Sequence, residues 1–167
     1  MKRFLILFAV VANLVLADAV TKELAAGCLK GAAAVSVIPG FFNLAYVENR
    51  GCAWGMFQGQ VWPLAVFGLV ALAFLIWRRK AVFEGRETGD GRRGWPWLAA
   101  IAEPCLYAGI LGNVIDRLFR GYVIDMFDFH RGVHHFPCFN VADSLICIAV
   151  GLLLLASFAE KPKKRGT

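Results

Sequence analysis

Four long apolar segments account for much of this chain of 167 residues. A helix needs about 20 mainly apolar residues to cross the hydrocarbon layer of a membrane, and each segment is close to that length. Hydrophobic residues form 59% of the chain, compared with roughly 45–50% in soluble domains. These features predict an all-α polytopic membrane protein that forms a single membrane domain. Its four transmembrane helices are expected at residues 4–20, 61–77, 95–115 and 138–159.

The segments between the apolar runs differ in composition. Residues 21–60 and 116–137 are the two expected outer segments. The first begins with a short amphipathic stretch at 24–36, followed by the strand-like run 41–47 and the loop sequence 48–51. The second is also rich in β-forming side chains. We therefore expect a small β-containing extracytoplasmic subdomain.

The distribution of basic residues predicts the orientation. Of the 18 Lys and Arg residues, 12 lie in the termini and in residues 78–94, and 6 lie in the two outer segments. Basic residues favour the cytoplasmic side of a membrane, so both termini and the inner loop 78–94 are expected there. The same pattern accounts for the net charge of +6, and no nucleic-acid partner is expected.

The first apolar segment has two interpretations. Lys2 and Arg3, the apolar run that follows, and Val15-Leu16-Ala17 fit a cleaved signal peptide. An uncleaved first span is the simpler interpretation, because three further apolar segments follow. Asp18 and Lys22 are four residues apart at the outer end of this span, where they can form an ion pair.

Two aspartates lie inside otherwise apolar sequence. Asp125 is in the run YVIDMF and Asp143 is in the run FNVADSLICIAV. A carboxylate at a hydrocarbon layer is costly and usually marks a functional site. Two carboxylates held close together cannot both ionise easily, so one keeps a proton and the other stays charged. We predict that the two form an acid/base pair near the outer face, oriented by Asn113 and Asn140, with no metal and no cofactor.

Other chemistries fit the sequence less well. Ser144 has no evident partner base for a serine mechanism. His130 and His134 have a spacing that could hold a metal ion, but the residues between them are loop-like and no HExxH motif occurs. The cysteines are odd in number and form no CxxC motif. The aspartates could also serve only as contacts between helices, although several acids clustered at one depth favour a functional site.

Five short motifs, in order along the chain, resemble those of lipoprotein signal peptidase, the bacterial type II signal peptidase. They are Asp18-x-x-x-Lys22, Asn49-Arg50-Gly51-Cys52-Ala53-Trp54-Gly55, Gly112-Asn113-Val114-Ile115-Asp116-Arg117, Val123-Ile124-Asp125-Met126 and Phe139-Asn140-Val141-Ala142-Asp143. No single motif is decisive, but all five together are specific. The chain departs from the family pattern at Cys52, where alanine is common, at Trp54, where phenylalanine is common, and at Ala108, where glycine is common.

The resemblance implies an aspartic endopeptidase of the bacterial cytoplasmic (inner) membrane, with Asp125 and Asp143 as its catalytic residues. Its partners would be prolipoproteins that carry diacylglycerol on the lipobox cysteine, membrane lipid and globomycin-type inhibitors. Cleavage would fall just before the modified cysteine. The residues expected to bind substrate or support the site are Asp18, Lys22, Asn49, Gly51, Asn113, Asp116, Arg117, Asn140 and Ala142. A small polytopic transporter or membrane assembly factor that uses the same acids is the alternative.

Overall fold

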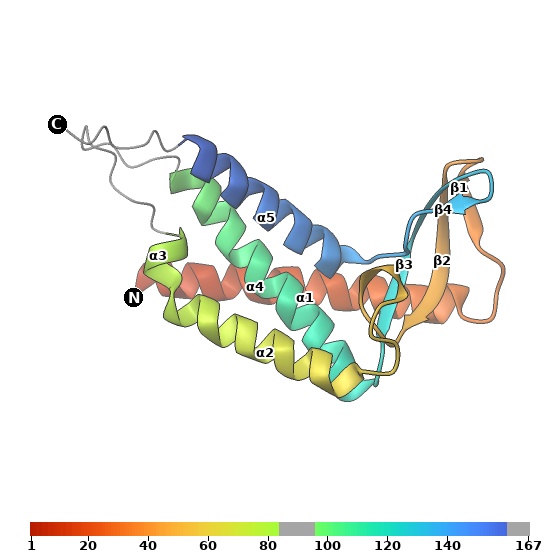
Figure 1. The fold of residues 1–167 in the computed structure, drawn as a ribbon, viewed down its shortest axis with the longest axis horizontal. Helices are drawn as coiled ribbons and strands as arrows, with labels where there is room; N and C mark the ends of the chain where they lie inside the picture. Colours follow the sequence, from red (N-terminus) through yellow and green to blue (C-terminus); the bar gives the residue numbers. More distant parts are fainter. Residues whose placement is uncertain (84–95, 160–167) are drawn as a thin grey trace.

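Long helices and one small antiparallel sheet make up the protein (Figure 1). The computed structural model describes residues 1–83 and 96–159. The helices are α1 (Lys2–Leu29), α2 (Val61–Trp77), α3 (Arg79–Phe83), α4 (Pro96–Phe119) and α5 (Val141–Ala159), with a 3-10 turn at Ala53–Gly55. The strands are β1 (Val35–Ile38), β2 (Phe42–Asn49), β3 (Val123–Arg131) and β4 (His134–His135). The expected combination of a mainly helical chain and a small sheet is confirmed.

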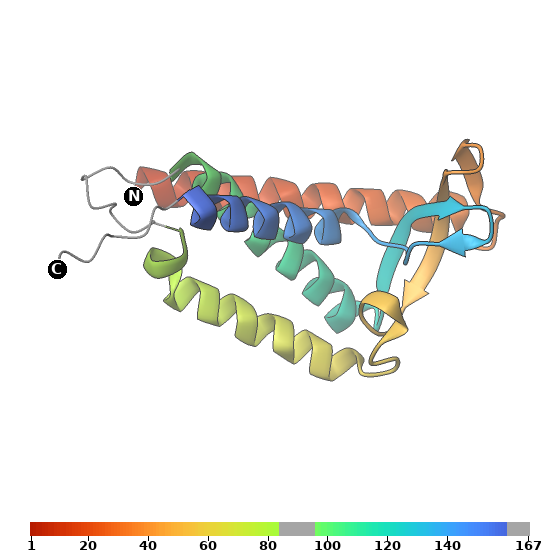
Figure 2. The same ribbon diagram turned by 45° about the horizontal axis from the view of Figure 1, so that its top comes forward.

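The four long helices run back and forth, and the sheet lies at the end of the bundle opposite Met1 (Figures 1 and 2). Helix α4 is central, because 72% of its most apolar stretch is buried, compared with 6% for α1 and 17% for α5. Helices α1, α2 and α5 each pack against α4. The main core cluster forms along α4 from Ala102, Leu106 and Ala108, with Leu145 and Ala149 of α5.

The outer surfaces of the helices are apolar. Large side chains such as Phe4, Phe67 and Phe158 are each more than two-thirds exposed. Such surfaces suit lipid, where an α-helix satisfies its own backbone polar groups. Within the described residues, three helices, α1, α4 and α5, are long and apolar enough to cross a membrane, and α2 is apolar but shorter, at 17 residues. The protein therefore has the features of a multi-pass membrane protein, while a fourth span at α2 stays a prediction.

Glycines allow the helices to approach closely around α4. A Cβ added to Gly109 would lie 2.5 Å from the carbonyl oxygen of Ala142 at the start of α5. A Cβ added to Gly112 would lie 2.5 Å from Oδ2 of Asp18 on α1. Small residues permit such contacts between membrane helices. Glycine at these two positions therefore lets α1 and α5 pack directly against α4.

The sheet has the strand order β1-β2-β3-β4, with antiparallel neighbours. In its central pair, Val47 of β2 lies opposite Asp125 of β3 and Asn49 lies opposite Val123, with an irregularity in β2 between Leu44 and Val47. The C-terminal end of α1 packs on β2 and β3. This contact joins the sheet to the helices and fixes the position of Asp125 relative to them.

Several boundaries differ from those expected. The separate amphipathic stretch at 24–36 is wrong, because α1 continues to Leu29 before Gly31, whose φ of +76° suits a helix end. Strand β2 extends through Asn49, so the expected loop begins later. Helix α4 continues to Phe119 and α5 begins at Val141. Of the inner loop 78–94 and the basic C-terminal tail, residues 84–94 and 160–167 lie outside the described residues.

Candidate active site

Asp125 lies in the middle of the sheet with its carboxylate held by two amides. Nδ2 of Asn49, on β2, donates to Asp125 Oδ2 at 2.9 Å, and Nδ2 of Asn140 donates to Oδ1 at 2.7 Å. The residue is 2% exposed. Burial, and then the nearby charge of Asp143, raises the pKa of Asp125 to about 7, although the two amide hydrogen bonds oppose the shift. Asp125 is therefore suited to carry a proton at neutral pH.

Asp143 occupies the first turn of α5 and forms a capping box with Asn140. The backbone N–H of Asp143 donates to Asn140 Oδ1 at 2.9 Å, and the backbone N–H of Asn140 donates to Asp143 Oδ2 at 3.2 Å. Nδ2 of Asn113, on α4, donates to Asp143 Oδ1 at 2.7 Å. The N-terminus of a helix also favours negative charge. These contacts fix the position of the Asp143 carboxyl group at the start of α5.

Two asparagines join the aspartates into one network. Asn140 contacts Asp125 through its side chain and Asp143 through the capping box, and its Nδ2 also donates to Asn113 Oδ1 at 3.2 Å. Asn140 is fully buried. The structure thus brings Asp125 and Asp143 to one place, on a strand and a helix separated along the chain, with Asn113 and Asn140 connecting them. We call Asp125 and Asp143 the aspartate pair.

A second polar group, the Lys22 cluster of Asp18, Lys22 and Asp116, lies beside the pair. The Lys22 ammonium is 2.8 Å from Asp18 Oδ2 and 2.8 Å from Asp116 Oδ2, and it donates to Asn113 Oδ1 at 3.2 Å. Asp18 Oδ1 accepts the backbone N–H of Ala142 at 2.8 Å. The cluster therefore ties α1, α4 and α5 together at the level of Asn113. The expected Asp18–Lys22 ion pair is present, and both side chains are buried.

Arg117 and Gly51 position the loop that follows β2. Nη2 of Arg117 donates to the carbonyl oxygen of Gly51 at 2.9 Å, and the N–H of Gly51 donates to Asn49 Oδ1 at 2.9 Å. A Cβ at Gly51 would collide with the carbonyl oxygen of Met56, so glycine is required for this turn. Because Asn49 also binds Asp125, this loop is connected directly to the aspartate pair. Arg117 and its neighbour Asp116 have different partners, since Asp116 contacts Lys22 and Arg120.

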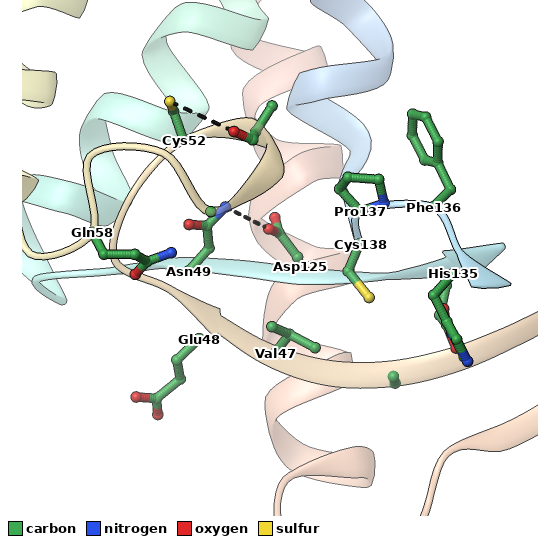
Figure 3. A pocket seen from close by; sticks show the side chains of 14 residues that line it. Val47, Glu48, Asn49, Cys52, Gln58, Asp125, His135, Phe136, Pro137 and Cys138 are labelled. Carbon is green, nitrogen blue, oxygen red and sulfur yellow. Dashed lines mark hydrogen bonds and ion pairs between the residues drawn. The ribbon is translucent and has the colours of Figure 1, made fainter. Parts of the chain in front are cut away.

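Two pockets meet at the aspartate pair. The sheet-side pocket has a volume of about 560 Å³ and includes Asp125, Asp128 and His135 in its lining (Figure 3). The membrane-side pocket has a volume of about 540 Å³ and includes Asp143, Ile146 and Ile148 of α5. Both pockets share the same rim, formed by Asn49, Cys52, Ala53, Phe136, Pro137 and Cys138. An extended chain that passes from one pocket to the other crosses this rim beside both aspartates.

The sequence did not indicate the pairing of Asp128 with His135. These side chains are 2.7 Å apart, and Asn43 Nδ2 donates to Asp128 Oδ2 at 3.1 Å. His130 stacks on His135, with ring centroids 4.9 Å apart. The spacing of His130 and His134 could suit metal ligands, but within residues 1–83 and 96–159 no three His, Cys, Asp or Glu side chains converge on a metal site. The only signal available in the sequence was the turn at Gly132, which pairs β3 with β4.

Known proteins are similar in sequence to this chain over most of its length. The chain matches the family model of signal peptidase (SPase) II over residues 10–159. A lipoprotein signal peptidase from Syntrophotalea carbinolica is 36% identical over 161 residues, which cover 95% of this chain and 94% of that protein. One from Clostridium acetobutylicum is 38% identical over 150 residues, which cover 89% of this chain and 90% of that protein.

Solved structures show the same relationship. A bacterial membrane enzyme determined by the in meso method at 2.3 Å matches with a TM-score of 0.74 and 30% identity, covering 96% of this chain and 94% of that chain. Another, determined at 1.9 Å, matches with a TM-score of 0.72 and 28% identity, covering 93% of this chain and 94% of that chain. The resemblance in sequence motifs is confirmed, and this chain belongs to the signal peptidase II family.

Proposed function

We propose that this protein is an aspartic endopeptidase that acts on diacylglyceryl-modified prolipoproteins and cuts just before the modified cysteine. Membership of the signal peptidase II family makes it a protease that removes signal peptides from prolipoproteins. The aspartic mechanism, the lipid on the substrate and the position of the bond are the proposed parts. The observation that carries the mechanism is the hydrogen-bonded link between Asp125 and Asp143 through Asn140.

The two aspartates take different roles in this mechanism. Asp143, ionised at the start of α5, takes a proton from water, and the water oxygen attacks the carbonyl carbon of the scissile peptide bond. Asp125, which is protonated, gives its proton to the carbonyl oxygen and so forms a tetrahedral diol. When the C–N bond breaks, Asp143 gives its proton to the leaving amine and Asp125 recovers a proton from one diol hydroxyl. Each carboxyl then has its starting charge, and no covalent intermediate is required.

The other predicted site residues have supporting roles in this proposal. Asn113 and Asn140 orient the carboxyl groups, and Asn49 holds Asp125 from the opposite strand. Gly51 and Arg117 hold the loop at the rim of both pockets. The remaining predicted residues hold α1, α4 and α5 together beside the pair. They are Asp18, Lys22, Asp116 and Ala142.

Topology is the second part of the proposal. We place all four long helices across the bacterial cytoplasmic (inner) membrane, with both termini in the cytoplasm and the aspartate pair near the outer face. The predominance of basic residues in the termini and in residues 78–94 supports this orientation. The alternation of the helices puts Met1 at one end and the sheet at the other, as Figure 1 shows. A reporter fused after residue 89 should therefore be active only if it works in the cytoplasm.

The lipid on the substrate has a positioning role in this account. A signal peptide that is already embedded gains little further free energy from burying acyl chains, so diacylglycerol acts mainly by fixing the depth of the scissile bond. The unmodified prolipoprotein is expected to be cleaved far more slowly at the same surface concentration. A globomycin-type inhibitor is expected to occupy the two pockets and block both forms of the substrate.

Replacement of each aspartate by asparagine tests the proposal. Asp125→Asn and Asp143→Asn keep the shape of the side chain but remove the exchangeable proton, so each should lower the cleavage rate at least about 1000-fold. Glu23→Gln, which removes one carboxylate on α1 outside the pockets, is the matched control and should cleave at the parental rate. Near-parental cleavage by either aspartate variant would refute the aspartic mechanism. A transporter or assembly factor is not favoured, because the family findings are those of a protease.

A further inference from the structure

The two pockets differ in the environment each offers to a polypeptide. The membrane-side pocket lies between α4 and α5, and Ile146, Cys147 and Ile148 line it. The sheet-side pocket is formed by β2, β3 and residues 135–138, beyond the ends of these helices. A signal peptide is apolar and helical, whereas the mature part of a lipoprotein is extracytoplasmic and polar. The geometry therefore assigns the signal-peptide side of the scissile bond to the membrane-side pocket and the mature side to the sheet-side pocket.

Apart from Asp125, two carboxylates line the sheet-side pocket, Glu48 and Asp128, and Asp128 is paired with His135. Asp128 is 6% exposed and is held from two sides, by His135 at 2.7 Å and by Asn43 at 3.1 Å. Burial raises its pKa, but the hydrogen bonds from His135 and Asn43 outweigh that effect and hold the pKa below its ordinary value. Glu48, which also lines the pocket, turns its side chain away from Asp125 in Figure 3 and is 3.3 Å from both Lys30 and Arg50.

The spacing along β3 relates Asp128 to a position on the substrate. Asp125 and Asp128 are three residues apart on one strand, and a strand rises about 3.3 Å per residue, so about 10 Å separates their backbone positions. An extended polypeptide has the same rise. Both aspartates line the sheet-side pocket, so a chain that has its scissile bond at Asp125 and continues through this pocket in the direction of Asp128 reaches Asp128 at about the third residue of the mature lipoprotein, where the first residue is the modified cysteine.

We propose that Asp128, positioned by His135 and Asn43, determines specificity at the third residue of the mature lipoprotein by favouring a basic over an acidic side chain. This proposal rests on the proposed function, because it assumes that the scissile bond lies at the aspartate pair. Neither the family membership nor the aspartic mechanism requires it. The Asp128–His135 pair lies in the pocket but outside the hydrogen-bond network of the aspartate pair.

The test is a competition between modified prolipoproteins that differ at one residue. The substrates carry lysine, glutamine or glutamate at the third mature position, and a second set carries the same residues at the sixth position. The relative kcat/KM is measured with the full-length enzyme in one detergent at low salt. The parental enzyme should cleave the substrate with lysine at the third position about fivefold faster than the one with glutamate there, which is the order expected for a partly exposed ion pair. At the sixth position the three forms should be equal.

Three enzyme variants complete the test. Asp128→Asn should bring the ratio of lysine to glutamate cleavage at the third position close to one, because the amide keeps the hydrogen bond to Asn43 but removes the charge. His135→Gln should increase the ratio of lysine to glutamate cleavage, because it removes the imidazole that contacts the Asp128 carboxylate and so leaves that carboxylate more accessible to a substrate lysine. Glu23→Gln changes the net charge by the same amount as Asp128→Asn, at a site outside the pocket, and should keep the parental ratio.

The ratio separates specificity from folding, since a variant with less folded enzyme cleaves every substrate more slowly but keeps the same preference. Equal rates for lysine and glutamate at the third position in the parental enzyme would overturn the proposal, as would an unchanged ratio in Asp128→Asn. A different observation would refute the proposed function, namely cleavage by Asp125→Asn or Asp143→Asn at the parental rate.

Discussion

The aspartate pair and the Lys22 cluster are neighbours that each contain two aspartates, yet their charges are arranged differently. In the cluster, two carboxylates each lie 2.8 Å from the Lys22 ammonium, and all three side chains are buried. In the pair, neutral amides and backbone N–H groups hold Asp125 and Asp143, and each aspartate lines a pocket. Ion pairing makes the first group a structural connection, whereas the second keeps a carboxyl group free to exchange a proton.

Asn113 connects the two groups, since it accepts a hydrogen bond from Lys22 and donates one to Asp143. The buried ammonium therefore also determines which way the Asn113 amide faces. With its oxygen on Lys22, the amide must present its NH₂ to Asp143. The structural group thus orients the reactive group without taking part in the proton transfers.

Among substitutions in these two groups, we expect the largest loss of stability at Lys22. Lys22→Met leaves Asp18 and Asp116 buried without their ammonium, and loss of one partner of a buried ion pair costs about 3–5 kcal/mol. We expect a large loss of thermal stability together with loss of cleavage. Lys30→Met is the control, because Lys30 is exposed and lies 3.3 Å from Glu48. If Lys22→Met melted like the parent, the cluster would not be the structural connection described above.

Asp125→Asn should have the opposite effect on stability. The pKa of Asp125 is about 7 in the folded protein, above its ordinary value of 3.8, so ionisation of this carboxyl destabilises the fold as pH rises from about 4 through 7. Asparagine has no proton to lose. The variant should therefore be more stable than the parent by about 4 kcal/mol at pH 8, with the difference disappearing below about pH 4.

Thermal unfolding of the parent and Asp125→Asn across this pH range measures the difference. A variant that is less stable than the parent at pH 8 would show that the folded protein does not disfavour ionisation of Asp125. The expected combination of greater stability and lost cleavage would distinguish Asp125 from every member of the Lys22 cluster.

A smaller effect is expected at Asn140. Asn140→Ala removes the cap of α5, which costs about 1 kcal/mol, and it removes the amide between the two carboxyl groups. We expect modest destabilisation but a disproportionate fall in kcat, measured with saturating modified substrate. Asn13→Ala is a matched control, because Nδ2 of Asn13 donates only within its own helix, to the carbonyl oxygen of Ala9. Loss of stability without a fall in kcat would make Asn140 a helix cap only.

The cysteines should have the smallest effect. Cys52 and Cys138 lie on the rim of both pockets, but burial, and then the charges of Asp128 and Asp125, raises the pKa of Cys138 to about 11, which disfavours the thiolate. A variant with all cysteines replaced by alanine or serine should keep cleavage within about threefold of the parent, a change of under 1 kcal/mol. The assay is the same cleavage measurement, and loss of turnover in a folded variant would reopen thiol chemistry.

The sequence predicted the Asp18–Lys22 pair, because these residues are one helical turn apart and the contact follows from one helix. It did not predict the cap formed by Asn140 and Asp143, because the expected span of 138–159 placed both residues inside the helix, whereas α5 begins at Val141. It could not predict that the Asp18–Lys22 pair is buried, because Asp116 reaches it only when α1 and α4 pack together at Gly112. Similarly, Asp128 meets His135 only through the register of β3 with β4.

The ends of α1 and β2 also could not be predicted from local sequence. Residues 24–29 contain good helix formers and no proline, yet their continuation of α1 depends on packing of Ala25 against Ile124 and Met126 of the sheet. Strand β2 includes Asn49 because the strand pairs with β3 up to Val123. Both features depend on residues more than 70 positions away along the chain, and local propensity contains no information about such contacts.

The central claim is that the aspartate pair shares one proton, held by Asp125, and the pH dependence of kcat/KM tests it most directly. The measurement follows cleavage of one modified prolipoprotein from about pH 6 to 9, with a chelator present throughout and Glu23→Gln as a control. Because Asp125 must be protonated, and its pKa is about 7, kcat/KM should fall as pH rises through that value, by about tenfold for each further unit. A kcat/KM that rises through pH 7 and stays high to pH 9 would contradict the assignment of the proton to Asp125.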